Sequence, residues 1–179
     1  MNHHEQIEIP LSKRKMILTL LGACVFVILG VLFVLNPEKF TSIIMRNPII
    51  ILISGIASIL FFGVVGISIF RKLLDKKPGL IINHEGVNDN SSGVSAGFIP
   101  WSDIREIKVS HVFNQKFLLF IVNNPEDYLD KIKNPLKRSA MKMNYKSYGS
   151  PISISSTVLQ TNFDDLSKVL VEKLKTYKQ

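Results

Sequence analysis

Cysteine is almost absent from this sequence of 179 residues. The single cysteine, Cys24, has no partner within the chain, so an intramolecular disulfide bond is excluded. A chain without disulfides is compatible with a reducing compartment such as the cytoplasm. We therefore expect a fold that no covalent cross-link stabilises.

Charged residues are absent from two long apolar runs, Met16 to Leu35 and Ile49 to Phe70. Each run has about 20 residues, and a helix of that length rises about 30 Å, the hydrocarbon thickness of a bilayer. A buried helix of a soluble protein normally keeps a polar stripe, whereas these runs are apolar on all sides. A cleaved signal peptide is the alternative for the first run, but this run is long for a signal core and no small-residue cleavage site follows. The sequence predicts two membrane helices, and with Cys24 as their only ionisable residue an ion pathway is disfavoured.

The ends of both helices carry boundary signals. Asn36 and Pro37 end the first helix, because proline cannot continue the hydrogen-bond ladder. Asn47 is a candidate N-cap for the second helix, with Pro48 at the first helical position. The short loop between them leaves no room for a domain, so residues 16–70 are predicted to form a helical hairpin.

Basic residues cluster outside the predicted hairpin. Three precede it and four follow it, whereas the loop between the helices has two; in chain order these are Lys13, Arg14, Lys15, Lys39, Arg46, Arg71, Lys72, Lys76 and Lys77. By the positive-inside rule, both termini of this integral membrane protein face the cytoplasm, with the hairpin in the inner or plasma membrane.

Recognisable catalytic and metal-binding patterns are scarce. Residues 93–97 match the G-x-S-x-G nucleophile elbow around Ser95, but a polar loop precedes them and Pro100 follows, where that motif needs a strand and a helix. The histidines, namely His3, His4, His84 and His111, have no metal-ligand spacing. The carboxylates Glu126, Asp127 and Asp130 follow Pro125 and predict the first turn of a short helix rather than an acid/base pair. We expect no enzyme activity, no cofactor and no metal.

The segment after the hairpin has short strand patterns and one closing helix. Apolar or alternating stretches at 80–82, 98–101, 107–112, 117–122 and 152–155 predict strands, of which 107–112 has one buried face and 117–122 is covered on both sides. Residues 88–97 are predicted to form a loop. Apolar residues at helical spacing from Phe163 to Tyr177, after a cap at Thr161 or Asn162, predict an amphipathic helix. Several strands followed by one helix indicate an α+β fold.

Three short segments carry a resemblance to known proteins, namely Ile7 to Lys15 (IEIPLSKRK), Gly97 to Ile104 (GFIPWSDI) and Tyr148 to Ile152 (YGSPI). On these residues the chain is similar to a family of uncharacterised small bacterial membrane proteins that joins two N-terminal helices to a pleckstrin-homology-like domain. The resemblance implies that residues 79–179 form an antiparallel β-barrel or sandwich capped by a C-terminal helix. Residues 1–15 are then a cytoplasmic N-terminal segment.

A basic segment without acids spans residues 131–146. We interpret it as a loop that contacts an anionic membrane surface or ligand, and a solvated loop is an equally good interpretation. Few aromatic residues are interleaved, so no nucleic acid is expected as a partner. The candidate contacts are Lys131, Lys133, Lys137, Arg138, Lys142 and Lys146.

The short segments on either side of the hairpin are expected to hold the following domain near the membrane. The linker of about nine residues from Arg71 to Gly79 spans at most about 30 Å, which keeps that domain close to the membrane. Alternating Ile7, Ile9 and Leu11 predict an added strand on the domain.

Two functions remain open. The first is a non-catalytic binding module that engages a protein, a peptide or anionic lipid. The second is a structural or assembly subunit whose hairpin makes the contacts. Membrane lipids are expected partners in either case. Small residues at four-residue spacing, Thr19 with Ala23 and Ser54 with Ser58, allow helices to approach closely. We expect them at the interface between the two helices of the hairpin, and oligomerisation through the helices is the alternative.

Overall fold

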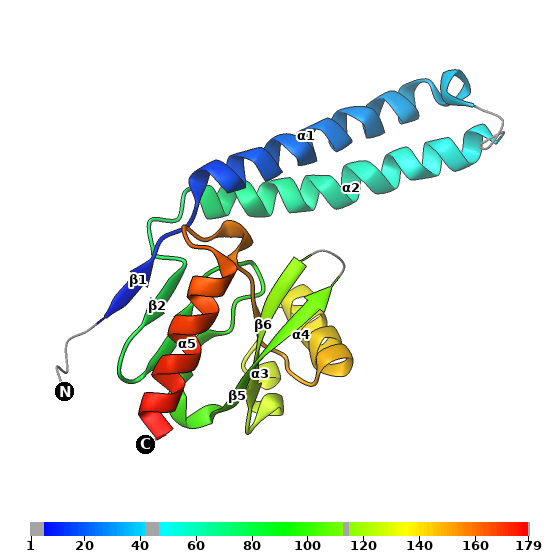
Figure 1. The fold of residues 1–179 in the computed structure, drawn as a ribbon. Coiled ribbons are helices and arrows are strands. Elements are labelled where there is room, and N and C mark those ends of the chain that lie inside the picture. Colours follow the sequence, from blue (N-terminus) through cyan, green and yellow to red (C-terminus); the bar gives the residue numbers. More distant parts are fainter. Residues whose placement is uncertain (1–5, 42–46, 113–114, 179) are drawn as a thin grey trace. The chain divides into compact units, whose positions relative to one another are not determined.

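The chain consists of two compact units, in each of which the residues mainly contact one another. A computed structural model describes residues 6–41, 47–112 and 115–178 (Figure 1). One unit is formed by residues 13–76 and the other by the residues on either side, up to Ser12 and from Lys77. The hairpin is therefore inserted into the chain of the other unit.

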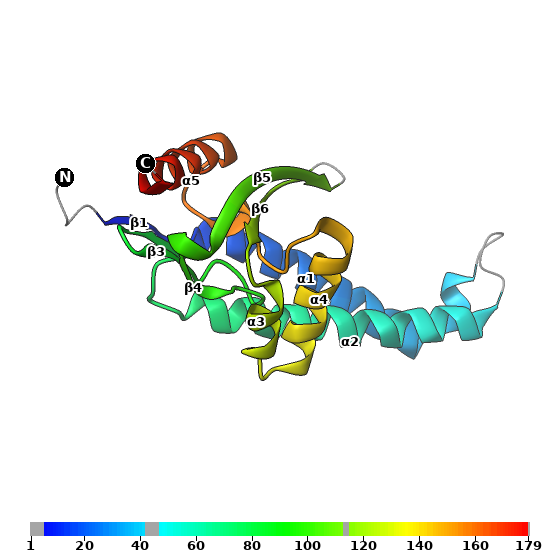
Figure 2. The same cartoon turned by 90° about the horizontal axis from the view of Figure 1, so that it is seen from below.

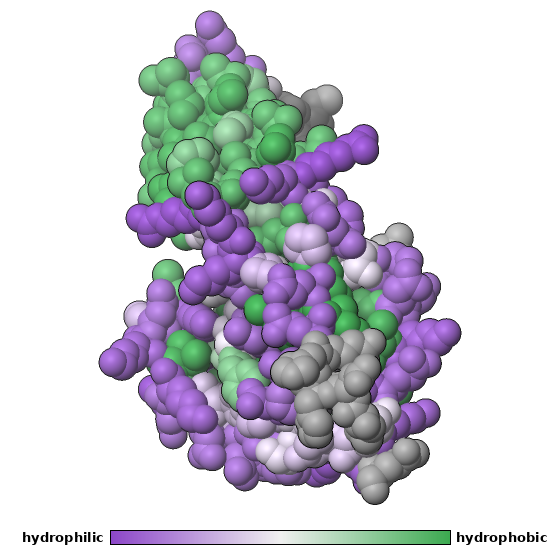
Figure 3. All heavy atoms as spheres, turned by 90° about the vertical axis from the view of Figure 1, so that its left-hand side faces the viewer, coloured by the Kyte–Doolittle hydropathy of each residue, from purple (hydrophilic) through white to green (hydrophobic). Residues whose placement is uncertain are grey.

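The first unit is a helical hairpin of α1 (Lys13–Leu35), η1 (Pro37–Phe40) and α2 (Pro48–Leu73). Both long helices are apolar and long enough to span a membrane, and Figure 3 shows their hydrophobic surface. The boundary predictions are confirmed: α1 ends before Asn36, and the Ile49 N–H donates to Asn47 Oδ1 at 2.9 Å with Pro48 next. Each helix extends about one turn beyond the apolar run at its charged end. Arg46 of the loop lies outside the described residues.

Two glycines form a close contact between α1 and α2. A Cβ placed on Gly30 would lie 2.9 Å from the Gly55 carbonyl oxygen, and one on Gly55 would lie 2.7 Å from the Gly30 carbonyl oxygen. Nearby, the Ser58 hydroxyl donates to the Phe26 carbonyl at 2.9 Å. Of the small residues expected at this interface Ser58 takes part, whereas Thr19 is exposed and donates to the Lys15 carbonyl on its own helix.

The second unit is α+β, with two antiparallel sheets. The first sheet has the order β1 (Ile7–Ile9), β2 (Leu80–Ile82), β3 (Gly86–Asp89) and β4 (Gly97–Pro100). The second has the order β5 (Ile104–Val112), β6 (Gln115–Val122) and β7 (Ser153–Ile154). Among the described residues the two sheets do not close into a barrel.

Short helices connect and cover these strands. They are η2 (Trp101–Asp103), α3 (Pro125–Asp130), α4 (Pro135–Tyr148), η3 (Ser156–Val158) and α5 (Phe163–Lys178). Figures 1 and 2 show α4 and α5 on opposite sides of the β5–β6 hairpin. The closing helix is confirmed: the Asp165 N–H donates to Asn162 Oδ1 at 2.8 Å, and Leu166, Leu170 and Leu174 are buried.

The core of this unit contains side chains from both sheets and from α4 and α5. The buried residues include Leu80, Ile82, Val87, Ile99, Trp101, Ile104, Leu118, Phe120, Met141, Ile152, Ile154, Leu159 and Leu170. Trp101 Nε1–H donates to the Asn83 carbonyl at 2.8 Å, so its one polar group is satisfied. The buried Tyr128 hydroxyl donates to Asp103 Oδ2 at 2.7 Å, and burial followed by this hydrogen bond raises the pKa of the tyrosine.

Two strand and loop predictions were wrong in part. Asn88 and Asp89 belong to β3 rather than to a loop, because the Asp89 carboxylate accepts hydrogen bonds from Ser91 and Ala96 and thereby closes the turn after the strand. The predicted buried face of β5 is open at Val109, whose side chain is 49% exposed beside α5. Burial of β6 on both faces is confirmed from Leu118 to Val122.

The prediction that the segment before the hairpin adds a strand to the domain is confirmed, and this strand is β1. Ile7, Glu8 and Ile9 pair with Ile82, Ile81 and Leu80 in an antiparallel ladder. The chain continues along the same unit, where Leu11 bridges to Leu159 and the Ser12 N–H donates to the Val158 carbonyl at 2.7 Å. The sheet therefore needs residues from both sides of the hairpin.

Replacing Ile9 by alanine is expected to lower the stability of the second unit by about 2 kcal/mol, because a buried side chain on the edge of the four-stranded sheet is lost. Thermal unfolding of the full chain in detergent measures the change. Glu8→Ala is the matched control, since Glu8 lies in the same strand with its side chain exposed. Equal melting temperatures for the two variants would contradict a packed β1.

Candidate functional site

The basic segment is largely helical, so its prediction as a loop was wrong. Asn134 caps α4 by accepting from the Leu136 and Lys137 N–H groups at 3.0 and 3.1 Å, with Pro135 at the first helical position. Gly149 ends the helix with φ +75°, a conformation that glycine adopts without strain. These local signals fix both ends of α4.

The outer face of α4 combines basic and apolar side chains. Arg138, Lys142 and Lys146 follow one another at four-residue spacing and form one line. Leu136 and Met143, seven residues apart, form a neighbouring line and are 74% and 66% exposed. Met141 is buried, so the side of the helix that carries it faces the core. We call Leu136, Arg138, Lys142, Met143 and Lys146 the α4 surface.

The structure separates the six basic candidates into three places. Arg138, Lys142 and Lys146 meet on the α4 surface, where Arg138 also pairs with Asp130 at 2.6 Å. Lys131 and Lys133 precede α4, and Lys131 Nζ lies 5.3 Å from the centre of the Tyr128 ring.

Lys137 lies apart from the other five basic candidates. It lines a cavity of about 360 Å³ together with Asn88, Ser92 and Ser95. Three of the six candidates therefore lie together on one surface.

A second recess lies between β5 and α5. It has a volume of about 470 Å³, and its lining includes Val109, His111, Phe163, Lys168 and Val171. Among the described strands, β5 pairs only with β6, so its other edge carries no ladder. An unpaired strand edge beside an amphipathic groove is suited to an extended peptide.

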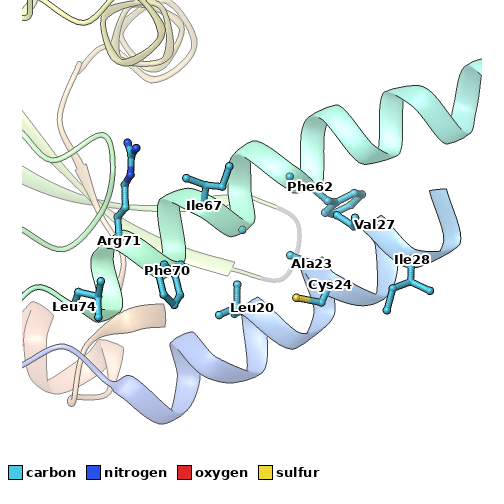
Figure 4. Close-up of a pocket in the computed structure, with 12 residues that line it drawn as sticks. Leu20, Ala23, Cys24, Val27, Ile28, Phe62, Ile67, Phe70, Arg71 and Leu74 are labelled. Atoms are coloured by element: carbon cyan, nitrogen blue, oxygen red, sulfur yellow. The ribbon is translucent and has the colours of Figure 1, made fainter. Parts of the chain in front are cut away.

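A third recess, the hairpin groove, lies between α1 and α2 and has a volume of about 670 Å³. Figure 4 shows Leu20, Ala23, Cys24 and Val27 on α1 and Phe62, Ile67 and Phe70 on α2 around it, with Arg71 near the end of α2. Gly63 and Gly66 complete its lining. No sequence signal identified this groove, because it depends on how closely the two helices approach.

The residues with possible catalytic roles have structural partners. The Ser95 hydroxyl donates to the Ser92 carbonyl at 2.6 Å and accepts from the Ser92 N–H at 2.7 Å, and β4 rather than a helix follows. His84 lies 3.9 Å from Glu85, whereas His3 and His4 lie outside the described residues. In the described part of the chain no three His, Cys, Asp or Glu side chains gather as metal ligands.

Comparison with known proteins does not identify a function. No family model, no curated protein and no solved structure matches the chain.

Proposed function

We propose that the protein is a membrane-anchored, non-catalytic binding module at the cytoplasmic face of the membrane, and that its α4 surface contacts anionic lipid. The observation that carries the proposal is this surface, where three basic side chains adjoin two strongly exposed apolar ones. Basic residues near an anionic leaflet each contribute about 1 kcal/mol, and neighbouring apolar side chains enter the boundary of headgroups and acyl chains. The helix itself carries no acid, and the acid that pairs with this surface is Asp130, which precedes α4 and contacts Arg138.

The strand pairing supports the anchoring. Because β1 and β2 pair, residues 7–9 and 80–82 must lie on the same side of any membrane that α1 and α2 cross. This agrees with a hairpin that crosses twice. The excess of basic residues at the open end of the hairpin favours the cytoplasmic side.

The order of the elements supports the resemblance to a pleckstrin-homology-like domain. Four antiparallel strands are followed by three more, and a C-terminal helix packs on them. We propose this fold, in a small bacterial membrane protein family, as the scaffold of the module. The fold of a scaffold does not determine which ligand it binds. The groove between β5 and α5 supports a peptide of a protein partner as a further ligand.

The α4 surface is tested in the full chain reconstituted into nanodiscs. An environment-sensitive dye is attached at Ser147→Cys, which is exposed beside the surface, in a Cys24→Ser background. We expect a blue shift with phosphatidylglycerol that is absent with phosphatidylcholine. In the α4 triple variant, Arg138→Gln with Lys142→Gln and Lys146→Gln, three charges are lost and the docking equilibrium constant is expected to fall about 100-fold.

A matched control removes three exposed charges elsewhere on the same unit, at Lys108, Lys168 and Lys175. This control is expected to keep the blue shift. A dye signal that ignores lipid charge, or that falls equally in both triple variants, would remove the α4 surface from the proposal.

The alternative function, an assembly subunit whose hairpin makes the contacts, is favoured by the hairpin groove. Crosslinking and affinity purification of full-length variants separate the two functions. Protein partners lost on filling the groove with Gly63→Leu but retained in the α4 triple variant support the subunit. Partners that both variants retain, with lipid-dependent docking of α4, support the binding module.

A further inference from the structure

The hairpin groove is almost entirely apolar. Its α1 wall includes Leu20 and Val27, and its α2 wall includes Phe62 and Phe70. Of the side chains that line it, only Arg71 carries a charge. This arginine lies just after Phe70, at the end of the apolar run of α2 (Figure 4).

The groove exists because α2 lacks side chains where it would otherwise fill the space. A Cβ on Gly63 would meet nothing within 4 Å, and one on Gly66 would make only ordinary contacts, at 3.7 Å with Leu20 and 3.9 Å with Ala23. The helices touch tightly elsewhere, at Gly30 and Gly55. The hollow is therefore a local feature of one half of the hairpin.

The length of the groove corresponds to one leaflet. From Phe62 to Leu74 the lining of α2 covers twelve residue steps, or about 18 Å along the helix. Half of the hydrocarbon thickness of a bilayer is about 15 Å. A transmembrane helix of a partner would run about 30 Å, twice that length, whereas an acyl chain of a phospholipid ends at the midplane.

The charge at the end of the groove identifies the headgroup. A guanidinium binds a phosphate with two parallel hydrogen bonds, and phosphate is the group that a phospholipid places at the edge of the hydrocarbon layer. The antiparallel hairpin brings the basic start of α1, Lys13 to Lys15, to the same end as Arg71. Positive charge at this end favours a lipid with net negative charge.

We propose that the hairpin groove binds one anionic phospholipid, with an acyl chain along Phe62, Gly63 and Gly66 and the phosphate at Arg71. The proposal rests on the membrane insertion of α1 and α2 and is independent of the α4 surface. It assigns the two glycines the role of making room for the chain, and Arg71 the role of selecting the headgroup.

Native mass spectrometry of the full-length protein, released from detergent with equimolar phosphatidylglycerol and phosphatidylcholine, tests the proposal. We expect one bound phosphatidylglycerol per chain. Arg71→Gln is expected to lower its occupancy relative to phosphatidylcholine about tenfold, because a charge-assisted contact is lost. Gly63→Leu, which places a side chain in the groove, is expected to reduce binding of both lipids.

Two matched controls accompany these variants. Lys39→Gln removes the same charge at the other end of the hairpin, and Gly22→Leu adds the same side chain where a Cβ meets nothing within 4 Å outside the groove. Both are expected to retain the lipid. In addition, phosphatidylglycerol with a photoreactive acyl chain is expected to label residues 20–28 and 62–66 of the unmodified protein, a readout that needs no variant.

Several results would overturn the proposal. Lipid occupancy that is the same in Arg71→Gln, Gly63→Leu and their controls, or photolabelling spread evenly over both helices, removes the site. A dimer that Gly63→Leu dissociates assigns the groove to a second copy, and a co-purified protein of discrete mass that it releases assigns it to a partner. The α4 dye signal is expected to persist in Arg71→Gln, so failure of this site and failure of the α4 surface give different results.

Discussion

Replacing Gly86 by alanine is expected to destabilise the α+β unit by about 3 kcal/mol and to lower its melting temperature by more than about 10 °C. A Cβ at this position would overlap the Ile99 carbonyl oxygen and lie 2.8 Å from the Pro100 Cα. These are backbone atoms of β4, so no side-chain rotation relieves the overlap. The strand pair β3–β4 must separate at the point where Gly86 faces Pro100.

The substitution at Gly86 is also expected to weaken the packing of the buried Trp101, because this residue directly follows β4. The Trp101 N–H donates to the Glu85 carbonyl at 3.1 Å, and its indole N–H donates to the Asn83 carbonyl at 2.8 Å. A shift of β4 strains both bonds, each of which contributes about 1 kcal/mol. Circular dichroism and the emission of this single tryptophan follow the unfolding of the full chain in detergent.

Gly93→Ala is the control for this variant, because a Cβ on Gly93 would meet nothing within 4 Å. It is expected to unfold within about 2 °C of the unmodified protein. Equal melting temperatures for Gly86→Ala and Gly93→Ala would refute the close approach of β3 and β4 at Gly86.

Replacing Gly55 by leucine is expected to force α1 and α2 apart by about 2 Å, since the distance between packed helices depends on the side chains at the contact. A Cβ at Gly55 would lie 2.7 Å from the Gly30 carbonyl oxygen and 2.9 Å from Phe33 Cβ. The Ser58 hydroxyl would then lose the Phe26 carbonyl, which it reaches at 2.9 Å across the same interface. Small residues at such a contact are what allow two membrane helices to approach closely.

The separation is measured as the distance between spin labels on Cys24 and on an Ile67→Cys variant in nanodiscs. Both positions line the hairpin groove, away from the Gly30 and Gly55 contact. Gly22→Leu is the control, because a Cβ on Gly22 meets nothing within 4 Å and this residue lies outside the groove. An unchanged distance in Gly55→Leu would mean that the glycine contact does not hold the hairpin together.

The hairpin could be predicted from the sequence because its signals are local. The charge-free runs set the lengths of α1 and α2, and a proline after asparagine marks the end of one helix and the start of the other. The groove between them could not be predicted, since it depends on which glycines face the other helix. Gly55 meets α1 directly and Gly63 meets nothing, although both lie in the same apolar run.

The α+β unit was predictable to a lesser extent. Its fold class followed from the hydrophobic pattern, the strand β6 from a continuous apolar run and the helix α5 from apolar residues at helical spacing. The helix α4 was missed because basic residues interrupt its apolar pattern and only Met141 is buried. The asparagine and proline before it and Gly149 after it were present in the sequence as helix boundaries.

The exposure of β5 is a different case. Alternation along a strand shows that two faces differ, but not whether the apolar face meets a core or the wall of a groove. Val109 belongs to the wall of the β5 and α5 groove. Only the position of α5 distinguishes these two environments.

The pairing of β1 with β2 determines the order of events during synthesis. About 70 residues separate Ile9 from its partner Leu80, and both helices of the hairpin lie between them. At about 5 to 20 residues per second, β1 leaves the ribosome some 4 to 14 seconds before β2 exists. The four-stranded sheet therefore forms only after the hairpin has been made, and a ribosome that stalls within α2 leaves an apolar strand without its neighbour.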